Sequence, residues 1–484
     1  MQFAGRRDAR LPAHEPHSSK RGIPTSRFAG IEPRRAYAPA PTALQYWEAR
    51  GEPARYGTWR GLAWSVFIAL SFFELTNPTH LVPNFPGAMG VLAAITGVVL
   101  ILDHRNVRLP RIPWTVVAYL ALCAASVFWS INRSDTVHMT ILYSWIALFA
   151  CVCVAQTDTQ TLLRGVAWGG VLVVAVTLLS VVVNPKRFGG GLLFPGEGPG
   201  VHGTKGIVAY SVVLATTAAL VRRPVSRRSW IDFCLTVVIN AVGVVIASAS
   251  TGRIGAAAVL ATWAALLLLR RLRGRRSGLG WVALAALAAV TTTVAILNRD
   301  RITSFLGERS DLNGRFEIWR AVIGGWLEAP IVGHGFGAVW YYGWWRLGGS
   351  PVLDRMNKAA NVKFFHGHNI FMDILPQLGA VGFAAALLIL IVLAARGVRN
   401  MSSHASASGW ALLVLVAVLV MGVAEPMLSV PIGWFSVVAA MAAARPEENT
   451  RRSLAPSGAP GRRSGQATLR AAGRTAAPDV RRQS

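Results

Sequence analysis

Apolar runs long enough to cross a membrane recur along most of this sequence, and they constrain the fold more than any other feature. A transmembrane α-helix needs roughly 20 mostly apolar residues. Lipid cannot satisfy open backbone polar groups, so such runs are expected to be helical. The sequence predicts twelve spans, at 62–78, 84–102, 113–131, 137–155, 162–184, 204–222, 229–248, 254–270, 280–297, 370–396, 409–424 and 427–444.

The positive charge of the chain follows this topology. A net charge of +27 could by itself indicate nucleic-acid binding. The arginines, however, gather in alternate short connections, around residues 105–111, 222–228, 270–276 and 396–399. This is the positive-inside pattern of multi-pass proteins. It predicts a protein of the cytoplasmic membrane with both termini in the cytoplasm and no nucleic-acid partner.

The spans define three regions. Residues 1–58 and 446–484 are basic, rich in small and polar residues and without apolar periodicity, which predicts disordered cytoplasmic arms. These arms either contact anionic membrane lipids or only set the topology. Residues 59–445 form the predicted transmembrane domain, with a large extracytoplasmic loop at 298–368 between spans nine and ten. Functional residues are expected on this loop, because the spans are committed to packing.

Several chemistries lack their sequence signatures. The four cysteines, Cys123, Cys151, Cys153 and Cys234, lie within predicted spans and have no metal-ligand spacing. There is no Asp-x-Asp and no ATP-binding motif. The sequence therefore predicts no cofactor and no bound metal.

A helix is predicted inside the large loop, over Gly314–Leu327. Asn313 can cap its start and Pro330 follows its end. An apolar stripe recurs at spacings of three and four: Phe316, Trp319, Ile323 and Trp326. Arg315 lies in the first turn, where a cation opposes the helix dipole. Arg315 is thus a candidate to bind an anionic ligand; the alternative is an ordinary salt bridge to Glu317 or Asp311.

The segment Pro330–Gly337 combines irregular backbone with aromatic residues. Glycines alternate at 333, 335 and 337 around His334, which predicts a tight turn. Aromatic residues follow at Trp340, Tyr341, Tyr342, Trp344 and Trp345. Their faces suit sugar rings, and the alternative is an aromatic belt at the membrane interface.

The loop ends in His366-Gly367-His368-Asn369. A histidine at the membrane boundary can act as a base near neutral pH. Two histidines at this spacing could also bind a metal ion, but no third ligand is evident in the sequence. The remaining alternative is a pair of ordinary interface histidines.

Two further cations are predicted on the outer face, Lys205 and Arg253, each at the start of a span. Positive-inside sorting disfavours cations there, so each needs a reason. An anionic phosphate is one reason, and a side chain that snorkels to the interface is the other.

These segments resemble the O-antigen ligase and polymerase superfamily of bacterial membrane glycosyltransferases, most closely its exopolysaccharide-polymerase branch. Asn313-Gly314-Arg315-x-x-x-Trp319 and Pro330-x-x-Gly333-x-Gly335 are similar to one family pattern, and His368-Asn369-x9-Gly379 matches another. The twelve-span layout with a late outer loop is similar too. Two positions depart from the family: Asn313 stands where threonine is usual, and Arg253 is displaced within its serine-rich element.

The resemblance implies a GT-C-like, all-α polytopic fold and a metal-independent glycosyltransferase. The implied donor is a glycan linked to undecaprenyl pyrophosphate, and the acceptor is a hydroxyl of a glycan or lipid. It implies His368 as general base, oriented by Asn369, with Arg315, Arg253 and Lys205 neutralising the pyrophosphate. His334, Trp319 and Trp340 are the remaining candidates for substrate contact.

Two other classes of function remain open at this point. A transporter or flippase of lipid-linked saccharide would need paired ionisable residues within spans and repeat symmetry. The sequence offers mainly Glu74 and Glu425, both near span ends, and no internal repeat. A non-catalytic glycan-binding component is the other. Ligase and polymerase differ only in their acceptor, which the sequence does not distinguish.

Overall fold

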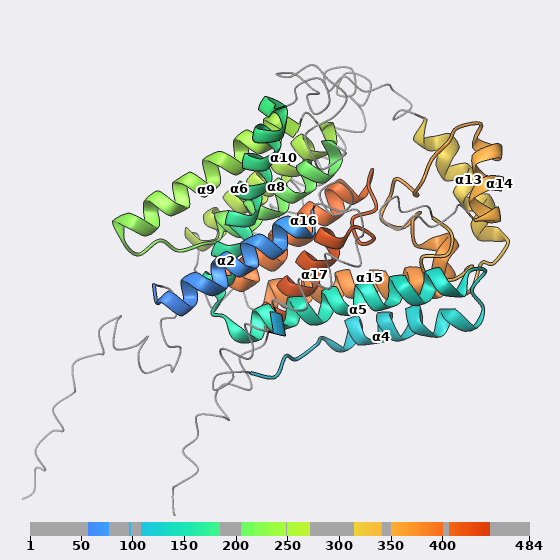
Figure 1. Cartoon of the computed structure of the whole chain (residues 1–484), viewed down its shortest axis with the longest axis horizontal. Coiled ribbons are helices and arrows are strands. Elements are labelled where there is room, and N and C mark those ends of the chain that lie inside the picture. The colour runs from blue at the N-terminus through green and yellow to red at the C-terminus, as the bar shows by residue number, and fades with distance from the viewer. Residues whose placement is uncertain are drawn as a thin grey trace, which may run out of the picture. The chain divides into compact units, whose positions relative to one another are not determined.

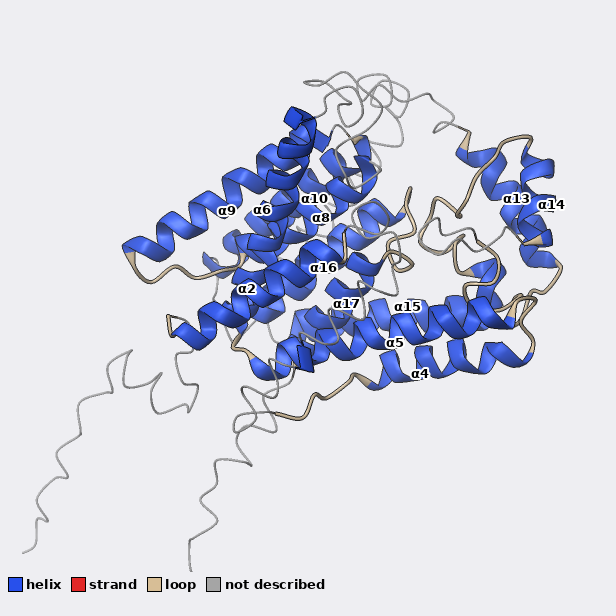
Figure 2. Ribbon diagram, in the orientation of Figure 1, coloured by secondary structure: helices blue, strands red, loops and turns tan. Residues whose placement is uncertain are grey.

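The computed structural model of the protein describes residues 57–76, 96–97, 108–183, 205–247, 249–271, 314–340, 350–399 and 406–445. The chain divides into two compact units, Met1–Pro53 and Ala54–Ser484, and every described residue lies in the second. Regular secondary structure within the described ranges is entirely helical (Figure 2). The predicted all-α fold class is confirmed for this part of the chain.

Many of these helices have the length and composition of membrane spans. Five are long and apolar enough to cross a bilayer: α5 (Arg133–Gln156), α6 (Thr159–Val183), α9 (Arg227–Ala247), α10 (Ser250–Arg271) and α15 (Leu375–Arg399). Shorter apolar helices are α4 (Trp114–Ala125) with its 3-10 extension η2 (Ser126–Phe128), α8 (Lys205–Leu220), α16 (Ser406–Gly422) and α17 (Pro431–Ala443). The remaining described helices are α2 (Trp59–Glu74), α13 (Arg315–Leu327) and α14 (Pro351–Ala360). The prediction of a polytopic membrane protein is confirmed.

Most predicted spans coincide with one of these helices to within a few residues. The clearest difference is the span predicted at 370–396, since α15 begins only at Leu375 and the preceding residues form turns. The spans predicted at 84–102 and 280–297 fall outside the described residues, apart from 96–97. The total of twelve spans and the position of the outer loop therefore stay predictions.

The helices pack in two groups that α16 joins. In one group, α2 lies along α6, α6 along α8, and α8 along both α9 and α10 (Figure 1). Gly165 and Gly169 of α6 make the first contact close, because a Cβ on either would lie 2.6–2.7 Å from Ile68 or Phe72 of α2. Small residues at this spacing allow close helix approach within membranes.

The second group positions the outer loop. It contains α4, α5, α15 and α17, with α16 packing on α15, on α17 and on α10 of the first group. The loop helices α13 and α14 lie against each other, and α13 also contacts α15 (Figure 1). Trp319, in the second turn of α13, donates to the Gly367 carbonyl in the chain that leads into α15.

Segments predicted on the same side of the membrane meet in the structure. On the side predicted to be cytoplasmic, the Arg445 guanidinium donates to the Arg111 carbonyl, and Gln160 bonds both Ser406 and the backbone N–H of Arg223. On the side predicted to be extracytoplasmic, the N–H of Ile131 donates to His334. These contacts agree with the alternation of arginine-rich connections.

Candidate catalytic site

The His366–Asn369 segment is fixed by its docking onto the end of α16. The Asn369 side-chain oxygen accepts from the N–H groups of Phe371 (2.8 Å) and Met372 (3.1 Å), which caps a short turn. The Asn369 amide donates to the Val423 carbonyl at 3.0 Å, and the Ile370 N–H donates to Gly422 at 2.8 Å. Asn369 therefore holds the backbone beside His368 in place.

Gly367, between the two histidines, is clamped on both sides. Its carbonyl accepts from the Trp319 indole at 3.1 Å, and its N–H donates to the buried Asp373 carboxylate at 2.9 Å. A Cβ at Gly367 would lie 2.6 Å from the Asp373 nitrogen, so no larger residue fits. His368 follows with φ 46°, in the left-handed region that few side chains adopt. Such local strain is common at functional sites.

The two imidazoles lie against each other. Their ring centroids are 4.0 Å apart, and the His368 N–H donates to Nδ1 of His366 at 3.2 Å. Because Nδ1 accepts, His366 is neutral in this arrangement. Burial, His368 and Arg315 hold the pKa of His366 well below its usual 6.5. Burial and then Arg315 lower the pKa of His368 to about 4. Both rings are therefore uncharged at neutral pH.

Arg315 faces these rings from the first turn of α13. The preceding Gly314 has φ 81° and offers no side-chain cap. Nη2 of Arg315 lies 3.4 Å from Oε1 of Glu425, and the two side chains are only 15% and 14% exposed. The ion-pair partner of Arg315 is thus Glu425, whereas the alternative from the sequence was Glu317 or Asp311; Asp311 lies outside the described residues.

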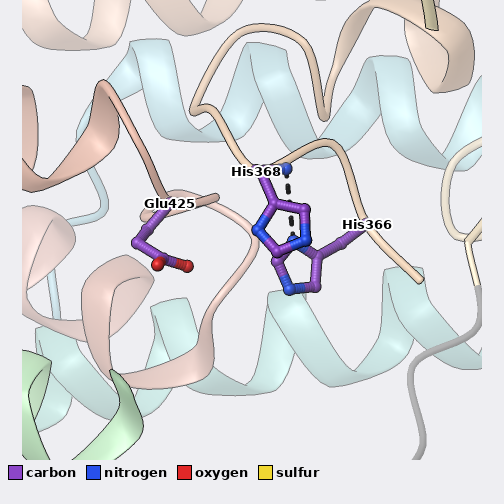
Figure 3. Close-up of side chains that lie close together, drawn as sticks. All are labelled: His366, His368 and Glu425. Carbon is purple, nitrogen blue, oxygen red and sulfur yellow. Dashed lines mark hydrogen bonds between the residues drawn. The ribbon is translucent and has the colours of Figure 1, made fainter. Parts of the chain in front are cut away.

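Glu425 is the site residue that sequence reasoning missed. It follows α16, and the Tyr210 hydroxyl of α8 donates to its carboxylate. Figure 3 shows this carboxylate directed towards the two imidazole rings. The only signal in the sequence is an isolated acid at the outer end of an apolar run.

Glu425 is the third possible metal ligand beside the two histidines, which was not evident in the sequence. Ligand atoms of His366, His368 and Glu425 all lie within 4.8 Å of one another (Figure 3). Histidine and glutamate are common ligands of zinc. The guanidinium of Arg315, however, already pairs with the one carboxylate of this set, and its charge would repel a divalent cation. The set therefore consists of two neutral imidazoles beside an ion pair between Arg315 and Glu425.

Lys205 and Arg253 lie at the beginnings of α8 and α10, at the ends of these helices that face this cluster. Lys205 begins α8, five positions before Tyr210, and is exposed. Arg253 lies in the first turn of α10. A Cβ on the neighbouring Gly252 would meet Ala209 of α8, and one on Gly255 would meet Met421 of α16. Among the described residues, neither cation forms a hydrogen bond or an ion pair with Arg315 or His368.

The other predicted substrate contacts hold the loop together. His334 lies close to the Gly325 carbonyl of α13, with Nε2 at 3.0 Å. Trp319 anchors Gly367, as described above. Trp340 is 1% exposed, its indole donates to the Asp373 carbonyl at 2.7 Å, and its ring packs on Phe364. Its ring is enclosed by protein in this structure, and its role as a substrate contact stays a prediction. The aromatic residues from Tyr341 to Trp345 lie outside the described residues.

Four backbone hydrogen bonds, which we call the clasp, join the segment after α13 to the beginning of α15, where the motif glycines lie. The N–H groups of His334 and Gly335 donate to the carbonyls of Pro376 and Gln377. In return, those of Ala380 and Val381 donate to Pro330 and Ile331. A Cβ at Gly333 would lie 2.4 Å from the Gln377 backbone, and one at Gly379 would lie 2.3 Å from that of Ile331. The two sequence patterns thus contact each other and fix α13, which carries Arg315, relative to the His368 loop.

Comparison with known proteins gives two matches. A family model described as O-antigen ligase matches residues 235–387, a range that contains Arg253, Arg315 and His368. The exopolysaccharide production protein ExoQ of Rhizobium meliloti (strain 1021) is 22% identical over 297 residues, covering 60% of this chain and 67% of that protein.

Proposed function

We propose that the chain is a member of the O-antigen ligase and polymerase superfamily, which both matches support, and that it is a glycosyltransferase acting on a glycan linked to undecaprenyl pyrophosphate. The observation that carries this proposal is a neutral imidazole, His368, held beside a guanidinium, Arg315, in a partly buried cluster. A base and a preorganised cation are the two groups that displacement of a diphosphate requires.

The proposed reaction is a direct displacement. The acceptor hydroxyl oxygen attacks the anomeric carbon of the donor sugar, and a new carbon–oxygen bond forms. The bond between that carbon and the phosphate oxygen breaks, and undecaprenyl pyrophosphate leaves with the electron pair. The hydroxyl proton passes to His368. Attack opposite the leaving group inverts the anomeric centre, and neither nucleotide nor metal enters the balance.

The cations neutralise the charge that grows on the leaving diphosphate. Arg315 is placed for this role beside the base, and its planar fork can bind two phosphate oxygens at once. Lys205 and Arg253, at the beginnings of α8 and α10, are proposed to bind the same diphosphate. Asn369 serves as a positioning residue through its bonds to the turn and to Val423.

The surroundings of His368 keep it neutral but make it a weak base. Its pKa of about 4 reflects burial first and the Arg315 charge second. A bound diphosphate would compensate the Arg315 charge, and the part of the lowering of the His368 pKa that Arg315 causes would disappear. His368 would then become a stronger base once the donor is present.

We place the reaction on the extracytoplasmic face of the cytoplasmic membrane, with both termini in the cytoplasm. The arginine-rich connections support this orientation, since positive connections stay inside. The name of the ExoQ relative concerns exopolysaccharide production, which favours polymerisation, with a growing glycan as acceptor, over transfer to a lipid. A transporter of lipid-linked saccharide is not favoured by the matches.

The test is single-turnover transfer with purified protein in liposomes that contain a lipid-linked oligosaccharide donor. His368→Ala is expected to abolish transfer, whereas His138→Ala, at an exposed position on α5, is expected to leave it intact. Normal transfer by His368→Ala removes His368 from the mechanism. Saccharide movement across the bilayer without a new glycosidic bond would favour the transporter instead.

A further inference from the structure

The charged groups of the cluster have partners, but the His368 imidazole lacks the hydrogen bond that would orient it as a base. The Glu425 carboxylate pairs with Arg315 and accepts from Tyr210. Nδ1 of His368 is buried and has no hydrogen-bond partner among the described residues. A catalytic imidazole ordinarily donates from one nitrogen to an orienting group, so that the other nitrogen can accept a proton.

We propose that the donor diphosphate replaces Glu425 on Arg315, and that the released carboxylate then accepts a hydrogen bond from Nδ1–H of His368. This inference rests on the proposed function. The resulting pair fixes the tautomer in which Nε2 is unprotonated and ready to accept the acceptor proton. Glu425 thereby acts as a positioning residue that engages the base only when the donor is bound.

The movement required is small. A carboxylate oxygen of Glu425 lies within 4.8 Å of a ligand nitrogen of His368, so a shift of about 2 Å gives a charge-assisted hydrogen bond. The carboxylate already points towards the rings (Figure 3). Glutamate can make such a shift by changing side-chain rotamer, with its backbone still held in the turn after α16.

The existing ion pair is open to replacement. At 3.4 Å, the contact between Arg315 and Glu425 is longer than the roughly 2.7–2.9 Å of a strong charge-assisted bond. A diphosphate carries more negative charge than one carboxylate and can occupy both arms of the guanidinium fork. Donor binding therefore favours exchange at Arg315.

The charged and titratable groups around His368 favour the new pair. His366 is neutral and cannot supply a countercharge, Tyr210 faces Glu425, and Asp373 is occupied with the Gly367 N–H. Once diphosphate compensates Arg315, Glu425 is the carboxylate left beside the imidazole. The arrangement links donor binding to activation of the base.

The experiment compares Glu425→Gln with the full-length wild-type enzyme in liposomes, and measures kcat and the donor KM separately. Glutamine no longer competes as an anion for Arg315 and no longer stabilises the imidazolium. We expect kcat to fall by about 10²-fold, whereas the donor KM falls or stays unchanged. The apparent pKa on the acid limb of the kcat profile should also be lower than in the wild type.

Glu328→Gln is the matched control, because Glu328 forms an exposed ion pair with Arg355 on the same loop. It should leave both parameters unchanged. A wild-type kcat in Glu425→Gln overturns the inference. A fall in kcat together with a higher donor KM also overturns it. If the glutamine variant does not fold, Glu425→Asp decides: its shorter carboxylate should lower kcat with no loss of donor affinity, and an unchanged kcat overturns the exchange.

Failure of this inference is distinguishable from failure of the proposed function. An inactive His368→Ala with a wild-type Glu425→Gln removes only the carboxylate exchange. Full transfer by His368→Ala removes the proposed base, and with it the reason for a partner at Nδ1.

Discussion

Nη2 of Arg315 lies 3.4 Å from Oε1 of Glu425, which joins the first turn of α13 to the turn that follows α16. The contact connects the outer loop to the end of the helical bundle. It also places the guanidinium where its charge acts on both histidines, as their lowered pKa values indicate.

Replacing Arg315 by lysine should lower transfer although the charge is kept. Lysine offers a point charge where the guanidinium offers a planar fork, so it cannot hold two phosphate oxygens at once. We expect kcat/KM for the donor to fall about tenfold to a hundredfold. Arg320→Lys, on the same helix, is the control and should transfer normally; an equal loss in both variants would point to α13 stability instead.

Gly333→Ala should disrupt the clasp between the two motif segments. The new methyl group would meet the Gln377 backbone at 2.4 Å, and the residue has φ 67°. We expect a loss of about 1–3 kcal/mol of stability and reduced transfer, measured by thermal unfolding in detergent and by activity.

Gly324→Ala provides the contrast within α13. A Cβ there has nothing within 4 Å, and alanine is favoured over glycine in a helix by about 0.5–1 kcal/mol. This variant should be at least as stable as the wild type. Similar destabilisation by both substitutions would contradict the clasp.

Asn369→Ala should reduce kcat through the position of His368. It removes two accepted hydrogen bonds and the bond to the Val423 carbonyl. Asn369→Asp keeps the accepting oxygens but loses the donor, so we expect it to retain more activity than alanine. Donor binding, measured separately, should change little in either variant. Equal activities of the alanine and wild-type enzymes would remove Asn369 from the site.

His368 should make stability depend on pH. Its pKa is lowered from 6.5 to about 4 in the folded protein, so the unfolded chain binds its proton more readily. The stabilising contribution is complete above pH 6.5 and is lost as the pH falls through about 4. The thermal unfolding temperature of the wild type should therefore drop more steeply across this window than that of His368→Gln. Parallel curves would show that His368 titrates at its ordinary pKa.

Local patterns predicted the parts of the structure that depend on neighbouring residues. Apolar runs gave the spans, and most lie within a few residues of the helices observed, such as α5 and α6. The alternating glycines at 333, 335 and 337 predicted irregular backbone, and all three have positive φ. Arg315 was a candidate because a cation in the first turn opposes the helix dipole, and His368 was a candidate because a histidine at the membrane boundary can act as a base. Each of these inferences uses only the residues within one or two helical turns.

Long-range packing decided the rest. The sequence determined by itself that the chain enters the membrane repeatedly as helices, because lipid leaves unsatisfied backbone groups no alternative. Only the tertiary structure brought Glu425 and Tyr210 to Arg315, enclosed Trp340 in the core and set His366 against His368. These contacts join segments from separate helices, and no local periodicity encodes which helix ends will meet.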